Sequence, residues 1–404
     1  MMRIVSEFKL LVGFLIGVVS FSSLADIQSQ TGSAYEPAIL EIVTKIQEGH
    51  LESALTAAEA HIEEFPKSRI GHLLRADILQ AMVSNPLAVQ NSKAAPRISN
   101  PVETTEGIRH QLKNRWHHHT AGQALSNTKV PASLIDMGRH QYVLVADMHA
   151  GRLYLYENQN GEPELIRDYY LTVGSEGYGK EFEGDNKTPI GVYSIYRHID
   201  GSELPDLYGK GAYPVNYPNV YDRAQKRTGY GIWLHGTPSN TYARSPWASE
   251  GCFVLSNSDL ADIEQFIDVE GRTPVVLAES IEWISQEELE SRRTSLSKAI
   301  ADWRQDWESL DTDAYLKHYS QEYFNFGTAN FDRWAKQKFD TNSRKTFIQI
   351  DLSIDGLFMY PGEQNMFVVY LSQNYLSNNF ASQSQKQQFW RRESSGAWKI
   401  VYEG

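Results

Sequence analysis

Two short stretches near the middle of the chain decide its interpretation, YGIWLHGT at residues 230–237 and SEGCFVLSN at residues 249–257. The first is an apolar run that ends in His235-Gly236, which predicts a strand with an imidazole at its end. The second places Cys252 directly after a glycine. Ser256 and Asp259 follow with the spacing of a helix cap. The sequence therefore predicts a histidine at a strand edge and a thiol just upstream of a helix.

A thiol and an imidazole in such positions are suited to nucleophilic catalysis. The histidine can take the thiol proton and later return it to a leaving amine. Backbone N–H groups around Gly251 and Cys252 can stabilise an oxyanion. If the pair exists, the pKa of Cys252 should lie below the free value of about 8.5. The alternative is an inert buried cysteine and a core histidine.

Strand patterns surround both stretches, from residue 141 to residue 278, with many turn residues between them. Little helix is expected there, which favours an antiparallel sandwich or a partial barrel. The expected strands cover residues 142–146, 152–156, 168–173, 190–196, 231–234 and 274–277.

The amino-acid sequence of these segments resembles that of the YkuD-type L,D-transpeptidase catalytic domain of bacterial cell-wall enzymes. The matching residues are His235, Gly236, Ser249, Gly251, Cys252, Asn257 and the GDNKTPIG run at residues 184–191. The resemblance implies that Cys252 is the nucleophile and His235 the general base and then acid. It also implies a substrate, the diaminopimelate-containing tetrapeptide stem of peptidoglycan, which would lose D-alanine.

Two residues depart from the family pattern. Glu250 stands where a second histidine is usual, and the resemblance implies that the backbone carbonyl at this position orients the catalytic imidazole. Val254 stands where many members have arginine, so a bidentate carboxylate donor is absent. We assign oxyanion and orientation roles to Gly251, Glu250, Ser249 and Gly236.

The polar segment before the His235 strand is a candidate lid over the substrate. Tyr221, Arg223, Arg227 and Tyr230 could contact an anionic stem peptide, together with Asn257 from the second stretch. A solvated loop with scattered charge is the alternative.

The chain after residue 279 changes to helices and then to a series of strands, which argues for a separate α+β domain. Trp303 and Trp307 lie four residues apart, and strands are expected at residues 347–354, 366–371, 387–392 and 398–402. This region, residues 279–404, resembles an NTF2-like fold.

The N-terminal region is expected to have three parts. Residues 1–25, with Arg3, Lys9 and an apolar run, have the pattern of a cleavable signal peptide. Residues 26–83 are expected to form a helical pair similar to one tetratricopeptide hairpin, which could bind a protein partner. Residues 84–140 are interpreted as a linker with one short helix. The triplet His117–His119 cannot converge on one metal ion from a helix, because adjacent side chains diverge.

Composition excludes several classes of function. With 38 basic and 50 acidic residues the net charge is −12, which disfavours nucleic acid as a partner. A single cysteine excludes an internal disulfide and a cysteine-rich metal site. No cofactor, metal or stable membrane insertion is indicated.

We therefore expect a multi-domain, mainly β periplasmic enzyme that forms an acyl-enzyme on Cys252. An amine acceptor would make it an L,D-transpeptidase, and water would make it an L,D-carboxypeptidase that trims tetrapeptides to tripeptides. A non-catalytic wall-binding scaffold is the alternative from another class.

Overall fold

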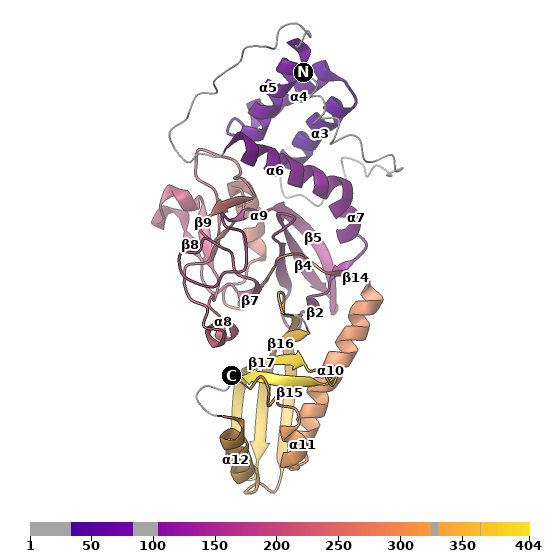
Figure 1. Cartoon of the computed structure of the whole chain (residues 1–404), viewed down its shortest axis with the longest axis vertical. Helices are drawn as coiled ribbons and strands as arrows, with labels where there is room; N and C mark the ends of the chain where they lie inside the picture. The colour runs from indigo at the N-terminus through magenta and orange to yellow at the C-terminus, as the bar shows by residue number, and fades with distance from the viewer. Residues whose placement is uncertain (1–33, 84–103, 325–329, 364) are drawn as a thin grey trace.

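The computed structural model describes residues 34–83, 104–324, 330–363 and 365–404. These form an elongated molecule with helices at one end, β sheets in the centre, and a long sheet with helices at the other end (Figure 1). The expected signal peptide lies outside the described residues. Within those residues, no helix is both long and apolar enough to cross a membrane.

Within the described residues 34–83 the chain forms three helices rather than the expected pair: α3 (Tyr35–Gln47), α4 (Leu51–Glu64) and α5 (Arg69–Val83). The break that the helical periodicity did not reveal is at Gly49, which has a positive φ of 81° and lies between α3 and α4. Glycine adopts this conformation without steric cost. The apolar faces of the helices enclose a core that includes Ile39, Ile42 and Leu74.

The segment expected to be a linker continues this helical module. Helix α6 (Thr105–His117) packs Ile108, Leu112 and Trp116 against the N-terminal core. A π-helical turn at His118–Gly122 and the short α7 (Gln123–Ser126) follow. His118 is buried whereas His117 is exposed, so the histidine triplet diverges. No group of three potential metal ligands occurs among the described residues.

The central domain is a sandwich of two mixed sheets, so the expected mainly β fold is confirmed but a purely antiparallel arrangement is wrong. The parallel pairs β3–β13 and β10–β12 account for the difference, because they join strands that are far apart in the sequence. One sheet has the order β5-β4-β3-β13-β7 and the other β12-β10-β9-β8, with β6 and β11 paired separately. Their bounds are β3 (Tyr142–Asp147), β4 (Arg152–Gln159), β5 (Glu162–Tyr170), β6 (Val173–Gly174), β7 (Gly191–Ser194), β8 (Ile199–Asp200), β9 (Gly211–Pro214), β10 (Trp233–His235), β11 (Trp247–Ser249), β12 (Phe253–Val254) and β13 (Pro274–Ala278).

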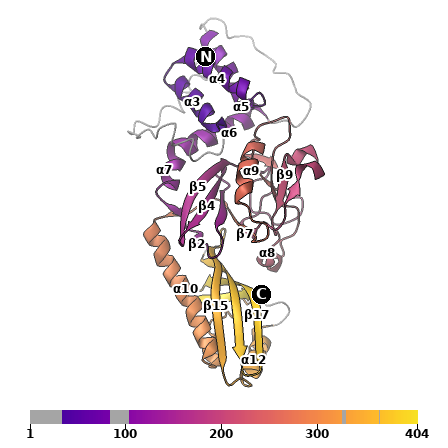
Figure 2. The same ribbon diagram turned by 180° about the vertical axis from the view of Figure 1, so that it is seen from behind.

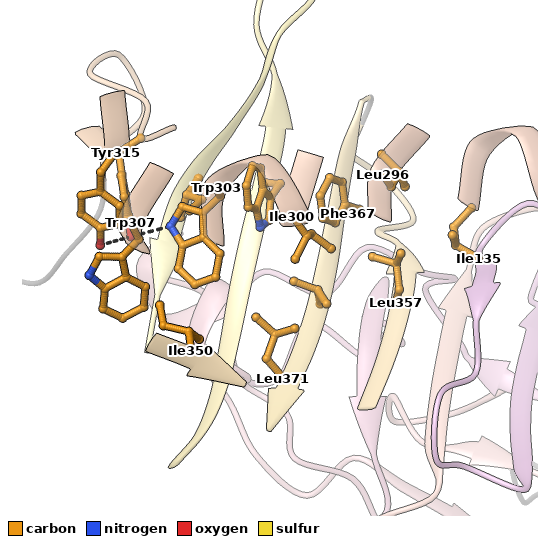
Figure 3. Packing of buried hydrophobic residues seen from close by; sticks show 14 of the residues in the cluster. Ile135, Leu296, Ile300, Trp303, Trp307, Tyr315, Ile350, Leu357, Phe367 and Leu371 are labelled. Atoms are coloured by element: carbon orange, nitrogen blue, oxygen red, sulfur yellow. Dashed lines mark hydrogen bonds between the residues drawn. The ribbon is translucent and has the colours of Figure 1, made fainter. Parts of the chain in front are cut away.

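The C-terminal domain is the expected NTF2-like α+β fold, with three helices among its described residues and a sheet of order β18-β17-β16-β15-β2. Aromatic residues of the long helix α10, Trp303 and Trp307, pack on sheet residues such as Ile350 and Phe367 (Figure 3). The fifth strand, β2, comes from the segment expected to be a linker. The elements are β1 (Val130–Pro131), β2 (Leu134–Asp136), β14 (Trp283–Ile284), α10 (Gln286–Glu308), α11 (Thr312–Leu316), α12 (Phe331–Asn342), β15 (Ile348–Met359), β16 (Met366–Ser377), β17 (Phe380–Arg392) and β18 (Trp398–Glu403).

The central and C-terminal domains share a hydrophobic core. Val145 and Tyr156 on the outer face of the first central sheet belong to the same buried cluster as Phe358, Val368 and Phe389 of the C-terminal sheet. The view from behind shows the C-terminal sheet directly below the central strands, with α10 alongside (Figure 2). The two domains are therefore fixed to each other by packing.

A buried network of charges fastens the helical module to the central domain. Glu36 of α3 accepts hydrogen bonds from Arg115 of α6 at 2.5 Å and from Arg152 of β4 at 2.7 Å. Arg152 also pairs with Asp168 of β5, which lies 3.3 Å from the imidazole of His118. Burial opposes ionisation, but the two arginines hold the pKa of Glu36 below its ordinary value of 4.5.

We expect Glu36→Gln to lower the free energy of unfolding by about 3 kcal/mol or more, because it removes the carboxylate that pairs with Arg115 and leaves Arg152 with Asp168 alone. Since the pKa of Glu36 is lowered on folding, its contribution is fully present above its ordinary pKa of 4.5 and is lost progressively as the pH falls from there through the lowered pKa of the folded state. Urea unfolding at pH 7 and at a series of pH values below 4.5 measures both effects.

The matched control is Glu41→Gln on the same helix, which removes an exposed pair with Lys45. That change should cost no more than about 0.5 kcal/mol. Equal losses for the two variants would contradict a stabilising role for the buried network.

Candidate active site

Adjacent strands bring the predicted histidine and cysteine to one face of the second sheet. In the parallel pair β10–β12, Leu234 lies opposite Phe253 and His235 opposite Val254. Leu234 and Phe253 are fully buried in the sandwich core. Since side chains alternate along a strand, His235 and the residue just before β12, Cys252, lie on the opposite face from that core.

His235 is held by the backbone of the next residue. Its Nδ1 lies 2.7 Å from the carbonyl oxygen of Gly236, which can only accept, so Nδ1 carries the proton and Nε2 carries the lone pair. The ring of Tyr208 packs edge-on against the imidazole at 5.0 Å. Orientation of the imidazole therefore comes from Gly236, not from the carbonyl of Glu250 that the family resemblance implied. Burial lowers the pKa of His235 to about 4.

The thiol of Cys252 is partly exposed and donates to the carbonyl oxygen of Gly231 at 3.3 Å. Burial by the surrounding protein raises the pKa of Cys252 to about 11, and the Glu250 carboxylate raises it further. A backbone hydrogen bond from Trp233 and the charge of Arg244 act in the opposite direction. The expected pKa below 8.5 is therefore wrong for the resting site. The pair rests as a neutral thiol and a neutral imidazole, because both charged forms would lose solvation.

The turn that presents the cysteine depends on Ser249 and Gly251. The Ser249 hydroxyl donates to the Cys252 carbonyl at 2.5 Å and accepts the Gly251 N–H at 3.1 Å. Gly251 has a φ of +120°, and a Cβ there would lie 2.8 Å from the Lys187 carbonyl oxygen. Only glycine fits without strain. Because the Gly251 N–H is bound to Ser249, it is not available to an oxyanion in this conformation.

Asn257 lies near the histidine but its amide is used by the backbone. Its Nδ2 donates to the Thr237 carbonyl at 2.7 Å, and its Oδ1 accepts the Lys210 N–H at 3.0 Å. Asn257 therefore fixes the loop that follows His235 rather than presenting its amide to a substrate.

The proposed lid residues separate into two groups. Tyr221 is buried, stacks on Phe389 at 5.3 Å and accepts from Arg391 at 3.2 Å, so it contacts the C-terminal domain. Arg227 pairs with Asp222 at 3.0 Å and lies 3.8 Å from Glu363 of that domain. A substrate-contacting role for these two is not supported, because their side chains are committed to the interface.

Arg223 is exposed, and its guanidinium donates to the Pro218 carbonyl. Tyr230 is 76% exposed and precedes Gly231, whose carbonyl accepts from the thiol. Of the four lid candidates, Tyr230 thus has a position next to the residues that hold Cys252.

Three residues near this site belong to no sequence motif that could have identified them. Tyr208 comes from a short 3-10 helix at Asp206–Tyr208, and Arg244 comes from the loop between β10 and β11. Lys180 lies in the loop at residues 174–191, where it pairs with Asp185 at 2.6 Å, and its positive charge lowers the pKa of Cys252. Only tertiary contacts bring them near His235 and Cys252. Asp185 organises its turn by accepting the backbone N–H groups of residues 181, 182 and 187.

Comparisons with known proteins agree with this division of the chain. Residues 141–277 match the family model of the YkuD L,D-transpeptidase catalytic domain, and residues 295–404 match that of the Cds6 C-terminal NTF2-like domain. Over 116 residues the chain is 31% identical to the putative L,D-transpeptidase YafK of Escherichia coli K12. The match covers 28% of this chain and 42% of YafK, so the chain spans less than half the length of this curated relative.

Two solved structures are similar over most of the chain. Bd1075 of Bdellovibrio bacteriovorus is 27% identical with a TM-score of 0.59, covering 68% of this chain and 97% of that one. The helical cell shape determining protein Pgp2 of Campylobacter jejuni is 25% identical with a TM-score of 0.58, covering 73% and 100%.

We expect iodoacetamide to label Cys252 slowly at neutral pH, without denaturant, and about tenfold faster for each pH unit up to about pH 11. The thiolate is the reactive form, and the pKa of Cys252 near 11 leaves only about one thiol in ten thousand ionised at pH 7. Glu250→Gln should shift the curve to lower pH, whereas Glu203→Gln, at an exposed position, should not. A plateau at or below pH 8.5 would show a stabilised thiolate instead, and labelling only after unfolding would contradict the accessible thiol.

Proposed function

Because residues 141–277 belong to the YkuD family of L,D-transpeptidase catalytic domains and residues 295–404 are an NTF2-like domain, we propose that this chain is an exported L,D-acyltransferase of peptidoglycan stem peptides. The observation that carries the proposal is the shared face of β10 and β12. There the His235 imidazole, with a proton-accepting Nε2, stands at the end of β10, and the Cys252 thiol lies directly before the adjacent β12.

The reaction begins with attack of the Cys252 sulfur on the carbonyl of the L-centre of diaminopimelate. His235 takes the thiol proton on Nε2 during the attack, then gives it to the nitrogen of the departing D-alanine. The products of this half-reaction are a thioester on Cys252 and free D-alanine. Gly236 keeps the imidazole in the required tautomer through its bond to Nδ1.

The acceptor decides the second half-reaction. An amine of a second stem peptide gives a crosslink, and water gives a tripeptide stem. Similarity to Pgp2 over the whole of that chain supports a role for this chain in cell shape. Both outcomes use the same acyl-enzyme, so a single assay distinguishes them.

Incubation of the purified protein with tetrapeptide muropeptides should release D-alanine, and mass spectrometry of the products identifies the acceptor. A crosslinked dimer assigns transpeptidation, whereas a tripeptide assigns carboxypeptidase activity. Cys252→Ala should abolish both products, and His235→Ala should lower the rate by roughly a hundredfold or more.

The matched control is Ser239→Ala, on the surface of the same domain. Folded, reduced wild-type protein that releases no D-alanine would contradict the enzymatic proposal. If Cys252→Ala also retained wall binding and rescued a deletion strain as well as the wild type, the chain would be a wall-binding scaffold.

The pH profile of kcat/KM should rise with an apparent pKa near 4 and stay flat to about pH 10. The lowered pKa of His235 keeps its Nε2 unprotonated, and able to accept the thiol proton, above about pH 4. The raised pKa of Cys252 places the second titration near 11. A bell-shaped profile confined between pH 6 and pH 8 would instead indicate that both groups titrate near their ordinary values.

A further inference from the structure

Arg244 lies in the loop between the strand that ends in His235 and the strand that leads to Cys252. Its guanidinium donates to the carbonyl of Ala248 in β11, one residue before Ser249 of the cysteine turn. The guanidinium therefore lies beside the turn that presents Cys252. Its positive charge also lowers the pKa of both His235 and Cys252.

The backbone of Arg244 is fixed from three directions. Its carbonyl oxygen accepts from Gln111 of α6 at 2.6 Å, from the Tyr170 hydroxyl of β5 at 3.1 Å and from the Thr172 hydroxyl at 3.2 Å. Three donors on one carbonyl oxygen fix the position of the Arg244 backbone relative to α6 and β5.

The residues on either side of Arg244 are held by the N-terminal helices. Tyr242 stacks on Tyr35 of α3 with ring centroids 3.7 Å apart. Ser245 packs so tightly against Gly107 of α6 that a Cβ at position 107 would lie 2.2 Å from the serine hydroxyl. The helical module therefore contacts the loop on both sides of Arg244 in the sequence.

The proposed substrate needs a cation at this place. The D-alanine that leaves is linked to the scissile carbonyl through its nitrogen, so its terminal carboxylate lies about one residue length, ~3.8 Å, from the reacting carbon. The protein has a net charge of −12, and Glu250 adds a carboxylate beside the thiol. An anion brought into this site without a cationic partner would be repelled and poorly solvated.

We propose that Arg244 binds the terminal carboxylate of the leaving D-amino acid, and that the N-terminal helices position it for this role. The proposal rests on the proposed function. A guanidinium has five N–H donors and can bind a carboxylate through two of them. Arg244 thus supplies, from a different place in the sequence, the carboxylate donor that is missing at Val254. Lys180 is less suited, because its ammonium is buried and paired with Asp185.

Binding to the Cys252→Ala protein tests the inference without turnover. Calorimetry would compare the diaminopimelate tetrapeptide with its C-terminal amide. The Arg244-containing protein should bind the acid roughly ten- to a hundredfold more tightly than the amide, the range expected for a hydrogen bond between charged groups. Adding Arg244→Met should remove this preference by weakening the acid alone, with the amide unchanged within about twofold.

Further variants separate charge, geometry and positioning. Arg197→Met, at an exposed position of the same domain, should leave the preference intact. Arg244→Lys should retain only part of it, because lysine cannot bind bidentately. Gln111→Leu, which removes one bond to the Arg244 carbonyl, should reduce the preference without removing it. Thermal unfolding checks that each variant is folded, and Arg244→Lys replaces Arg244→Met if the latter is not.

The inference is overturned if Arg244→Met weakens acid and amide equally, if it weakens neither, or if the parent protein binds neither ligand. Failure of the proposed function looks different. In that case the Cys252-containing protein releases no D-alanine although the preference for the acid depends on Arg244. Release of D-alanine with a KM that does not change in Arg244→Met would leave the proposed function in place and refute the role of Arg244.

Discussion

The buried network of Glu36, Arg115, Arg152 and Asp168 is the constraint on which the assembly of the catalytic region depends. Charges with so little exposure are tolerated only when every partner is in place. Helices α3 and α6 and strands β4 and β5 must therefore come together as one unit. The N-terminal helices are consequently part of the structure around the candidate active site, and their contacts with the loop at residues 237–247 follow from that attachment.

Local chemistry was predictable from the sequence, whereas long-range pairing was not. The strand that ends in His235, the helix α9 (Asn257–Ile263) capped by Ser256, and the helix that contains Trp303 and Trp307 all follow from patterns of a few residues. The parallel pair β10–β12 and the entry of β2 into the C-terminal sheet do not, because they join residues whose patterns are independent. The family resemblance supplied the association of His235 with Cys252 that the patterns alone could not.

The electrostatics of the site were the least accessible to sequence reasoning. A cysteine followed by a helix cap suggested a stabilised thiolate, but the pKa of Cys252 is raised because burial outweighs the nearby positive charges. The pKa of His235 moves the other way for the same reason. The site therefore holds its proton on sulfur, and a neutral thiol is less readily oxidised than a thiolate.

Strand β2 has a consequence for the self-association of the C-terminal domain. It pairs with β15 through Leu134 and Asp136, and so covers part of what would otherwise be the open edge of a four-stranded sheet. Open edges offer unpaired N–H and C=O groups to other chains and promote aggregation. The segment that protects this edge is encoded before the catalytic domain, far from the rest of the sheet. A C-terminal domain expressed alone from residue 279 onward would therefore lose β2, which covers the β15 edge, as well as its contacts with the central domain.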